Sequence, residues 1–192
     1  MKKYLFFVSH CLFLLACKQV NLVNNSDDYF KKVKIETLVT DDFSVRAITI
    51  DNNKIWYAAD KGKYGYYDLV SQEKFQTSVK KDTLLPEFRS IAKIGKSIFL
   101  LSVGNPALLY KISKDGSETK LVYQENHKKV FYDSMQFWNE KEGIAMGDPT
   151  DDCLSVIVTR DSGETWQKIP CGKLPKANLG EAAFAASNTN LI

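Results

Sequence analysis

The sequence predicts an all-β fold, a β-propeller of four-stranded blades. Three related segments begin at Val45, Phe88 and Phe131, so the unit repeats every 43 residues. This interval fits one four-stranded blade, which takes about 40–45 residues. Within each unit, short runs of β-branched and aromatic residues are separated by Gly, Asn and Asp, a pattern typical of strands joined by tight turns.

Each unit is expected to contain four strands, the first of which starts at the repeated opening. The other expected strands are, unit by unit, 55–57, 64–69 and a strand near Phe75; 98–101, 108–112 and 121–123; and 144–146, 154–159 and 166–169. Near-alternation of apolar residues over 30–40 predicts one further strand ahead of the repeats. The blades are therefore assigned to residues 45–87, 88–130 and 131–180 of a domain over 33–192.

A fourth unit, 181–192, stops within its expected second strand. Its first strand is expected over 181–186, where the composition is helix-like but the position in the repeat is that of a blade opening. A closed propeller needs at least four blades, and an open ring exposes a sheet edge. We therefore expect a C-terminally truncated piece of a longer propeller. The alternative is a four-bladed ring completed by the strand over 30–40.

The first 16 residues are expected to be a lipoprotein signal peptide. Two lysines precede an apolar run over 4–15, which is shorter than the roughly 20 apolar residues that span a bilayer. The run ends in Leu-Leu-Ala before Cys17, as in a bacterial lipobox, so Cys17 is the expected lipidation site. The alternative is an ordinary cleaved signal peptide with a chance cysteine.

The segment over 17–32 is polar and is expected to tether the domain to its lipid. Lys18 follows the cysteine, so the aspartate that retains some lipoproteins at the inner membrane is absent. This favours the outer membrane of a bacterial cell envelope and leaves the leaflet open. The formal charge of +3 includes two signal-peptide lysines, so it gives no indication of nucleic-acid binding.

Cys153 and Cys171 are the cysteines of the expected folded part, and they flank the turn over 159–166 almost symmetrically. On a hairpin they would face each other across two strands, at a separation close to that of a disulfide. An oxidising envelope compartment favours the disulfide over two reduced thiols.

Residues 159–166 fit the pattern S/T-x-D-x-G-x-T-W, with its fixed positions at Thr159, Asp161, Gly163 and Trp166. A degraded copy begins at Ser113, 46 residues earlier. In this respect the chain resembles BNR-repeat, sialidase-like propellers, in which this Asp box is a structural turn on the outside of a blade. The resemblance implies a scaffold and leaves the ligand open.

Four segments besides the Asp box resemble the bacterial relatives of the photosystem II stability and assembly factor. They are the openings 45–48 and 88–91, the segment 62–68 and the segment 143–149. The resemblance covers about 33–192 and implies a propeller that binds a protein partner in an assembly or scaffolding role. No glycine fingerprint of a dinucleotide site follows a strand and opens a helix, so no cofactor is expected.

Arg46 and Arg89 stand on first strands, whose ends approach the central channel of a propeller. With Tyr132 and Asp148, they form the expected binding residues of the channel face. A glycan-binding or sialidase-like propeller is the main alternative. Sialidase chemistry needs three converging arginines, and Arg160 lies inside the Asp-box turn. With no complete catalytic set, we expect no enzyme; a non-functional fragment is the remaining alternative.

Asp148, Asp151 and Asp152 form an acidic loop. Calcium takes about 6–8 oxygen ligands, so a turn with solvated charges is favoured over a metal site, and no metal is expected. The three tryptophans are expected to pack between blades, with carbohydrate stacking by one of them as the alternative. They are Trp56, Trp138 and Trp166.

Overall fold

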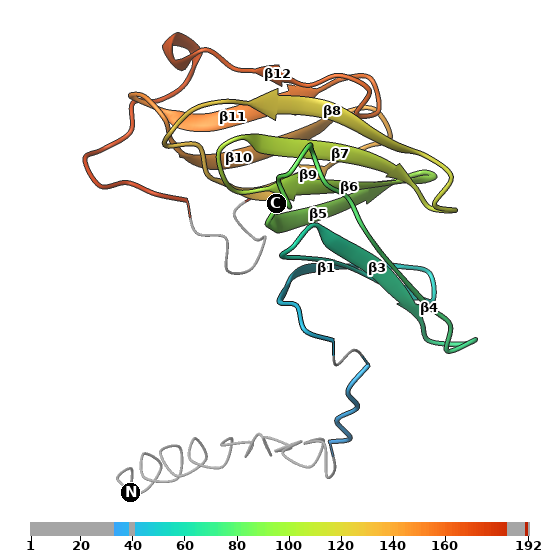
Figure 1. Cartoon of the computed structure of the whole chain (residues 1–192). Helices are drawn as coiled ribbons and strands as arrows, with labels where there is room; N and C mark the ends of the chain where they lie inside the picture. The colour runs from blue at the N-terminus through green and yellow to red at the C-terminus, as the bar shows by residue number, and fades with distance from the viewer. Residues whose placement is uncertain (1–32, 39–40, 184–190, 192) are drawn as a thin grey trace, which may run out of the picture. The chain divides into compact units, whose positions relative to one another are not determined.

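The computed structural model describes residues 33–38, 41–183 and 191 (Figure 1). The chain divides into two units, Met1–Thr37 and Leu38–Ile192. The signal peptide, Cys17 and the tether over 17–32 lie outside the described residues. The strand expected over 30–40 is not formed by its described residues, 33–38, which carry no regular secondary structure.

The described part of the second unit contains three four-stranded antiparallel sheets, each made of strands consecutive in the chain. Blade 1 contains β1 (Val45–Asp51), β2 (Lys54–Ala59), β3 (Lys63–Asp68) and β4 (Lys74–Ser78). Blade 2 contains β5 (Phe88–Ile94), β6 (Ser97–Ser102), β7 (Ala107–Ser113) and β8 (Thr119–Glu125). Blade 3 contains β9 (Tyr132–Phe137), β10 (Gly143–Pro149), β11 (Leu154–Thr159) and β12 (Gln167–Lys168). The predicted all-β fold of four-stranded blades is confirmed.

The blades pack face to face, with their first strands next to one another. Strand β1 contacts β5, and β5 contacts β9 in turn; Figure 1 shows β5 beside both. Within each blade the remaining strands follow outward in sequence order. The first strands are therefore the innermost strands of the incomplete ring.

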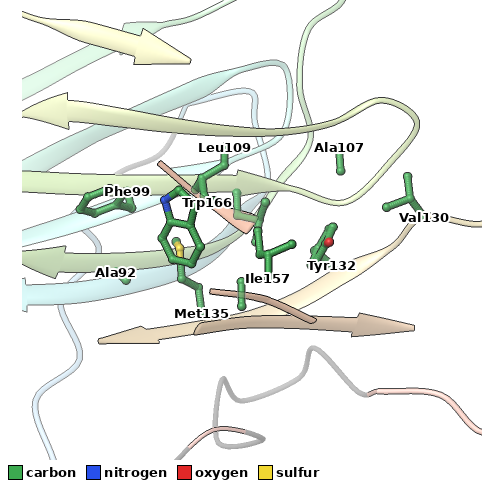
Figure 2. Packing of buried hydrophobic residues seen from close by; sticks show 11 residues of the cluster. Ala92, Phe99, Ala107, Leu109, Val130, Tyr132, Met135, Ile157 and Trp166 are labelled. Atoms are coloured by element: carbon green, nitrogen blue, oxygen red, sulfur yellow. The ribbon is translucent and has the colours of Figure 1, made fainter. Parts of the chain in front are cut away.

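Blade 2 lies between two hydrophobic cores. On β6, Ile98 and Leu100 belong to the core shared with blade 1, while Phe99 and Leu101 belong to the core shared with blade 3. Successive side chains of a strand point to opposite faces, so a strand buried on both faces needs a continuous apolar run. Figure 2 shows the second core, where Phe99 and Trp166 lie close together.

The tryptophans differ in burial. Trp56 and Trp166 are buried in the first and second cores. Trp138 is 56% exposed, so the expectation that it packs between blades is wrong. It follows the end of β9, in the turn to β10, where its indole N–H donates to Glu142 Oε2 at 3.3 Å.

The turn over 159–166 is organised around Asp161. Its Oδ1 accepts hydrogen bonds from the Thr159 hydroxyl at 2.8 Å and the Thr165 amide at 3.0 Å. The Gly163 amide donates to Thr159 Oγ1 at 3.0 Å. These bonds hold the strand-to-strand turn closed and deliver Trp166 into the core between blades 2 and 3.

A similar turn occurs between β7 and β8. Asp115 Oδ1 accepts hydrogen bonds from the Ser117 amide at 3.0 Å and the Ser117 hydroxyl at 2.7 Å. Hydrogen bonds from Ser113 and Ser117 lower the pKa of the Asp115 carboxyl to about 2. Both turns thus use an aspartate as the acceptor for groups that the hairpin would otherwise leave unpaired.

Cys153 and Cys171 form a disulfide with Cα atoms 5.5 Å apart. Neither lies within a strand: Cys153 precedes β11, and Cys171 begins the short 3₁₀ helix η1 (Cys171–Lys173) after β12. The bond therefore closes the open end of the β11–β12 hairpin, which has only two paired positions.

The first strand expected over 181–186 is not formed by 181–183, and its other residues lie outside the described part of the chain. Among the described residues, no helix is long and apolar enough to cross a membrane.

Gly163→Ala is expected to lower the free energy of unfolding by at least about 2 kcal/mol. Gly163 has φ +74°, and an added Cβ would lie 2.3 Å from Phe99 Cε1 in the core. The matched control is Gly172→Ala in η1, where an added Cβ would have no neighbour within 4 Å. Urea denaturation of both variants measures the difference, and equal losses would contradict this account.

Candidate functional site

Equivalent β-bulges occur near the start of each innermost strand. The strand pairing skips Arg46 in β1, Arg89 in β5 and Asp133 in β9. A bulge leaves one extra residue outside the ladder and bends the strand at that point, often to re-aim a side chain. Three neighbouring strands thus carry a charged residue at the same structural position, and we call these residues the bulge group.

The bulge group corrects one sequence-based expectation. A constant repeat of 43 residues makes Tyr132 equivalent to Arg89. The pairing within each blade instead makes Tyr132 equivalent to Phe88, the last paired residue before the bulge, and Asp133 equivalent to Arg89. Tyr132 is fully buried in the core between blades 2 and 3 and donates its hydroxyl to Glu125 Oε2 at 2.8 Å. It is therefore not a residue of the channel face.

Asp133 was missed because the third blade is offset by one residue. The aromatic–charged–serine triplets Phe88-Arg89-Ser90 and Tyr132-Asp133-Ser134 are the signal that identifies it. Aligning these triplets, instead of keeping the interval constant, brings the bulge residues into register.

The two arginines of the bulge group differ in their surroundings. Arg46 is exposed and forms no hydrogen bond or ion pair with another described residue. The Arg89 guanidinium lies 5.4 Å from the centre of the Phe131 ring, and its Nη2 lies 4.0 Å from Glu87 Oε1. Arg89 Nε is buried without a hydrogen-bond partner among the described residues. The contacts with Phe131 and Glu87 therefore orient the Arg89 side chain, and its Nε–H donor is left without an acceptor among the described residues.

Asp133 is 1% exposed, and neither of its carboxylate oxygens has a hydrogen-bond partner among the described residues. Burial, followed by repulsion from Asp148, raises the pKa of its carboxyl to about 7, against the opposing effect of Arg89. An unpaired charge is costly to bury, because it loses its hydration without compensation. The start of β9 therefore holds a strong acceptor that the described residues do not satisfy.

Asp148 lies beside the start of β9. It stands near the end of β10, and its amide donates to the Phe131 carbonyl at 2.8 Å. Its Oδ1 accepts a hydrogen bond from the Ala183 amide at 2.8 Å. Asp148 thus belongs with Asp133 at the same end of blade 3.

A pocket of about 560 Å³ opens next to Asp148. Its charged lining consists of four acidic residues and one basic residue: Asp148, Asp151, Asp152, Glu181 and Lys129. Within the described ranges, no group of three or more His, Cys, Asp or Glu residues is placed to hold a metal ion. The pocket is therefore an acidic surface without the ligand geometry of a metal centre.

Arg160 lies at the opposite end of blade 3. Thr159, which precedes Arg160, pairs with Gly143, and Gly143 pairs with Phe137, the last residue of β9. Arg160 Nη1 forms an ion pair with Glu142 Oε1 at 2.7 Å. It is therefore separated from the bulge group by the length of the blade.

A second polar cluster joins blades 2 and 3 beneath Tyr132. Glu125, at the end of β8, accepts hydrogen bonds from the hydroxyls of Tyr123 and Tyr132 at 2.7 and 2.8 Å. It also forms an ion pair with Lys168 of β12. Burial opposes ionisation, but these contacts hold the pKa of Glu125 below its usual value. The cluster is satisfied internally, so it serves to connect the blades.

No protein-family model and no curated protein matches the sequence. Similarity is found among solved structures. The structure of YCF48 bound to D1 peptide is 16% identical with a TM-score of 0.50, covering 66% of this chain and 39% of that one. The structure of U3-55K is 13% identical with a TM-score of 0.49, covering 69% and 41%. YCF48 from Cyanidioschyzon merolae is 14% identical with a TM-score of 0.44, covering 66% and 40%.

The similarity to the peptide-bound YCF48 structure supports the β-propeller fold. This chain spans less than half the length of each of these three structures.

Asp133→Asn is expected to change how stability depends on pH. The pKa of the Asp133 carboxyl is near 7 in the folded protein, above its value in the unfolded chain. The folded protein therefore loses stability as pH rises from about 4 to 7, because the unfolded chain ionises this carboxyl more readily. The amide removes that loss, so the variant should gain stability relative to wild type at pH 8, by up to about 4 kcal/mol.

Chemical denaturation between pH 4 and 8 measures this gain. Asp115→Asn provides the contrast, because the pKa of Asp115 is lowered to about 2 and its contribution is lost only below about pH 4, so the difference between this variant and wild type should stay constant from pH 4 to 8. A stability difference between wild type and Asp133→Asn that is the same at pH 4 and pH 8 would show that Asp133 is not the buried acid described above.

Proposed function

We propose that this protein binds a segment of a protein partner across the bulge group, and that it acts in the cell envelope as an assembly or scaffolding factor. The observation that carries the proposal is the bulge group itself. It places Arg46, Arg89 and Asp133 at one position of three adjacent innermost strands. Two of the three keep buried polar atoms without partners among the described residues.

Unsatisfied buried polar groups cost about 1–3 kcal/mol each. They are rare in folded proteins, and those that persist call for an explanation such as a ligand, an ion or ordered water. A peptide segment offers groups that suit the arginines, since its carboxylates and carbonyls can accept hydrogen bonds from the guanidinium groups of Arg46 and Arg89. The bulge group is therefore better suited to recognition than to stability.

The fold comparison agrees with this proposal. The YCF48 structure with the similar fold is bound to D1 peptide, so a propeller of this type can hold a peptide. At 16% identity the similarity concerns the fold, and peptide binding by this chain is our proposal.

The glycan-active alternative gains no support from the described residues. It requires a third arginine beside Arg46 and Arg89, and Arg160 lies at the opposite end of blade 3 in an ion pair with Glu142. The exposed Trp138 lies in the turn after β9, at that same end. Neither residue is placed to complete a saccharide site around the bulge group.

Charge reversal of Arg46 and Arg89 to Glu is expected to reduce partner binding at least tenfold, because the carboxylates would repel the acidic or carbonyl groups that the arginines attract. The measurement is affinity capture from envelope extract, with the captured proteins quantified by mass spectrometry. Arg160→Glu is the matched control and should leave capture unchanged. Equal capture by the double variant and wild type would show that the bulge group is not the binding surface.

The envelope location is also a proposal, which rests on the N-terminal sequence. Cys17→Ser is expected to abolish incorporation of radiolabelled palmitate and to release the protein from the membrane fraction, because the acyl chains of the lipid attached to the cysteine provide the anchor. Cys11→Ser lies within the signal peptide and should leave labelling intact. Palmitate labelling of the Cys17→Ser variant at the wild-type level would contradict lipidation at this residue. Outer-membrane placement would be tested by density-gradient fractionation.

A further inference from the structure

We propose that two copies of this chain associate head to tail and close one propeller ring, with blade 3 of each copy packed against blade 1 of the other. This inference goes beyond the proposed function and does not depend on peptide binding. It concerns the two sheet faces at the ends of the row of blades, which no other blade covers among the described residues.

The two open faces are the two halves of one kind of interface. On the second strands, Trp56 of blade 1 and Phe99 of blade 2 point toward the blade that follows, on what we call the forward face. Ile98 of blade 2 and Ala145 of blade 3 point toward the preceding blade, on the backward face. Both internal junctions therefore join a forward face to a backward face, and one face of each kind is left open.

The open backward face of blade 1 is apolar and exposed. On β1, Ile48 is 63% exposed and Ile50 is 60% exposed, while the intervening positions face blade 2. Ile50 pairs with Ile55 of β2, which extends the same face. Leu69, just after β3, is 52% exposed. Contiguous exposed apolar side chains of this kind mark a surface that another protein covers.

The open forward face of blade 3 is also apolar. Ile144 and Met146 of β10 pair with Val158 and Val156 of β11. Strand alternation places these four side chains opposite Ala145, which belongs to the core shared with blade 2. Val156 is buried, and the other three are half-buried. Blade 3 thus has an aliphatic forward face of the kind that forms the cores at the internal junctions.

One position distinguishes the open faces from the junction of blades 1 and 2. At that junction, Asp51 of blade 1 forms ion pairs with Lys93 and Lys114 of blade 2, at 3.4 and 2.8 Å. Asp51 and Trp138 follow the bulges of their blades by the same number of residues, so Trp138 is the equivalent of Asp51 on blade 3. By the same comparison, Ile50 is the equivalent of Lys93 on blade 1.

Lys114 has an apolar equivalent on blade 1 as well. The Lys114 amide donates to the carbonyl of Lys96 in the turn between the first two strands, as the Leu69 amide donates to Asn53. The acidic position is therefore tryptophan on the open face of blade 3, and both lysine positions are aliphatic on the open face of blade 1.

This matched change favours a second copy as the occupant of both faces. Trp138 is 56% exposed, as are its expected contacts Ile50 and Leu69 to a similar degree. Tryptophan is among the side chains that contribute most to binding when an interface buries them. If blade 3 and blade 1 each met an unrelated surface, nothing would require both sides of the same contact to change from charged to apolar together.

Charge complementarity supports the same arrangement at the other end of the faces. First strands are neighbours at each internal junction, so β9 of one copy would lie beside β1 of the second copy. Arg46, which is exposed and unpaired among the described residues, would then approach the end of blade 3 that carries Asp148, Asp151 and Asp152. Opposite charges on the two sides of an interface fix its register.

The number of blades sets the number of copies. A closed propeller has about four to eight blades. One copy supplies three described blades, two copies supply six, and three copies would supply nine. A head-to-tail contact forms a closed ring when its rotation returns to the start. Two copies therefore give a ring of the usual size.

The test measures the molar mass of the full-length protein by size-exclusion chromatography with light scattering, at micromolar concentration in a mild detergent. Wild type should have twice the mass of one chain. Trp138→Asp and Ile50→Lys should each raise the dissociation constant at least about a hundredfold, because each places an unpaired charge against an apolar face. Both residues are exposed in a single copy, so circular dichroism should show an unchanged fold.

An equimolar mixture of the two variants tests the head-to-tail contact directly. One junction of the mixed dimer joins Trp138→Asp to Ile50→Lys, which recreates the ion pair between Asp51 and Lys93, and the other junction is wild type. The mixture should therefore recover the dimer mass. Leu121→Lys is the matched control, because it alters an exposed side chain of β8 in the middle blade. It should dimerise as wild type does and should not rescue Trp138→Asp.

Three results would overturn the proposal. Wild type that is a monomer, or a series of larger oligomers, is not a two-copy ring. Dimers that persist in both Trp138→Asp and Ile50→Lys use a different surface. Variants that stay monomeric when mixed do not pair blade 3 with blade 1. Each of these results leaves peptide binding to be decided by its own test.

Discussion

The structure depends on the burial of one strand from both sides. Strand β6 presents Ile98 and Leu100 to blade 1 and Phe99 and Leu101 to blade 3, and all four side chains are fully buried. Full burial of each such side chain contributes about 1.5–3 kcal/mol. Because β6 has no free face, blades 1 and 3 have fixed positions against blade 2, and their innermost strands are aligned with it.

The alignment of the innermost strands turns a local irregularity into a site. A single β-bulge re-aims one side chain, but three bulges at the same position of adjacent strands bring three charged side chains into one group. A close backbone approach fixes the fourth charged residue. An added Cβ on Gly147 would lie 2.0 Å from the Phe131 carbonyl oxygen, so the end of β10 lies tightly against the start of β9, and Asp148 stands next to Asp133.

The fold could be predicted because hydrophobic runs in the sequence determine its strands. The candidate site was harder to predict because it depends on the exact pairing register of the innermost strands. A run such as Ile98-Phe99-Leu100-Leu101 has one physical explanation, a strand buried on both faces. A shift of one residue is invisible to a repeat count, yet it moves a side chain from the core to the bulge position. This is why Tyr132 was assigned to the channel face and Asp133 was not considered. The strand expected over 30–40 shows a related limit, because alternation alone does not supply a neighbouring strand with which to pair.

Opposite charges at equivalent positions have a consequence that a patch of one sign lacks. A surface of arginines alone attracts an acidic segment in either direction, since each arginine offers the same interaction. Asp133 at the third bulge would make the two directions unequal for the proposed segment, because a reversed segment would place its anion on the side of Asp133 and Asp148.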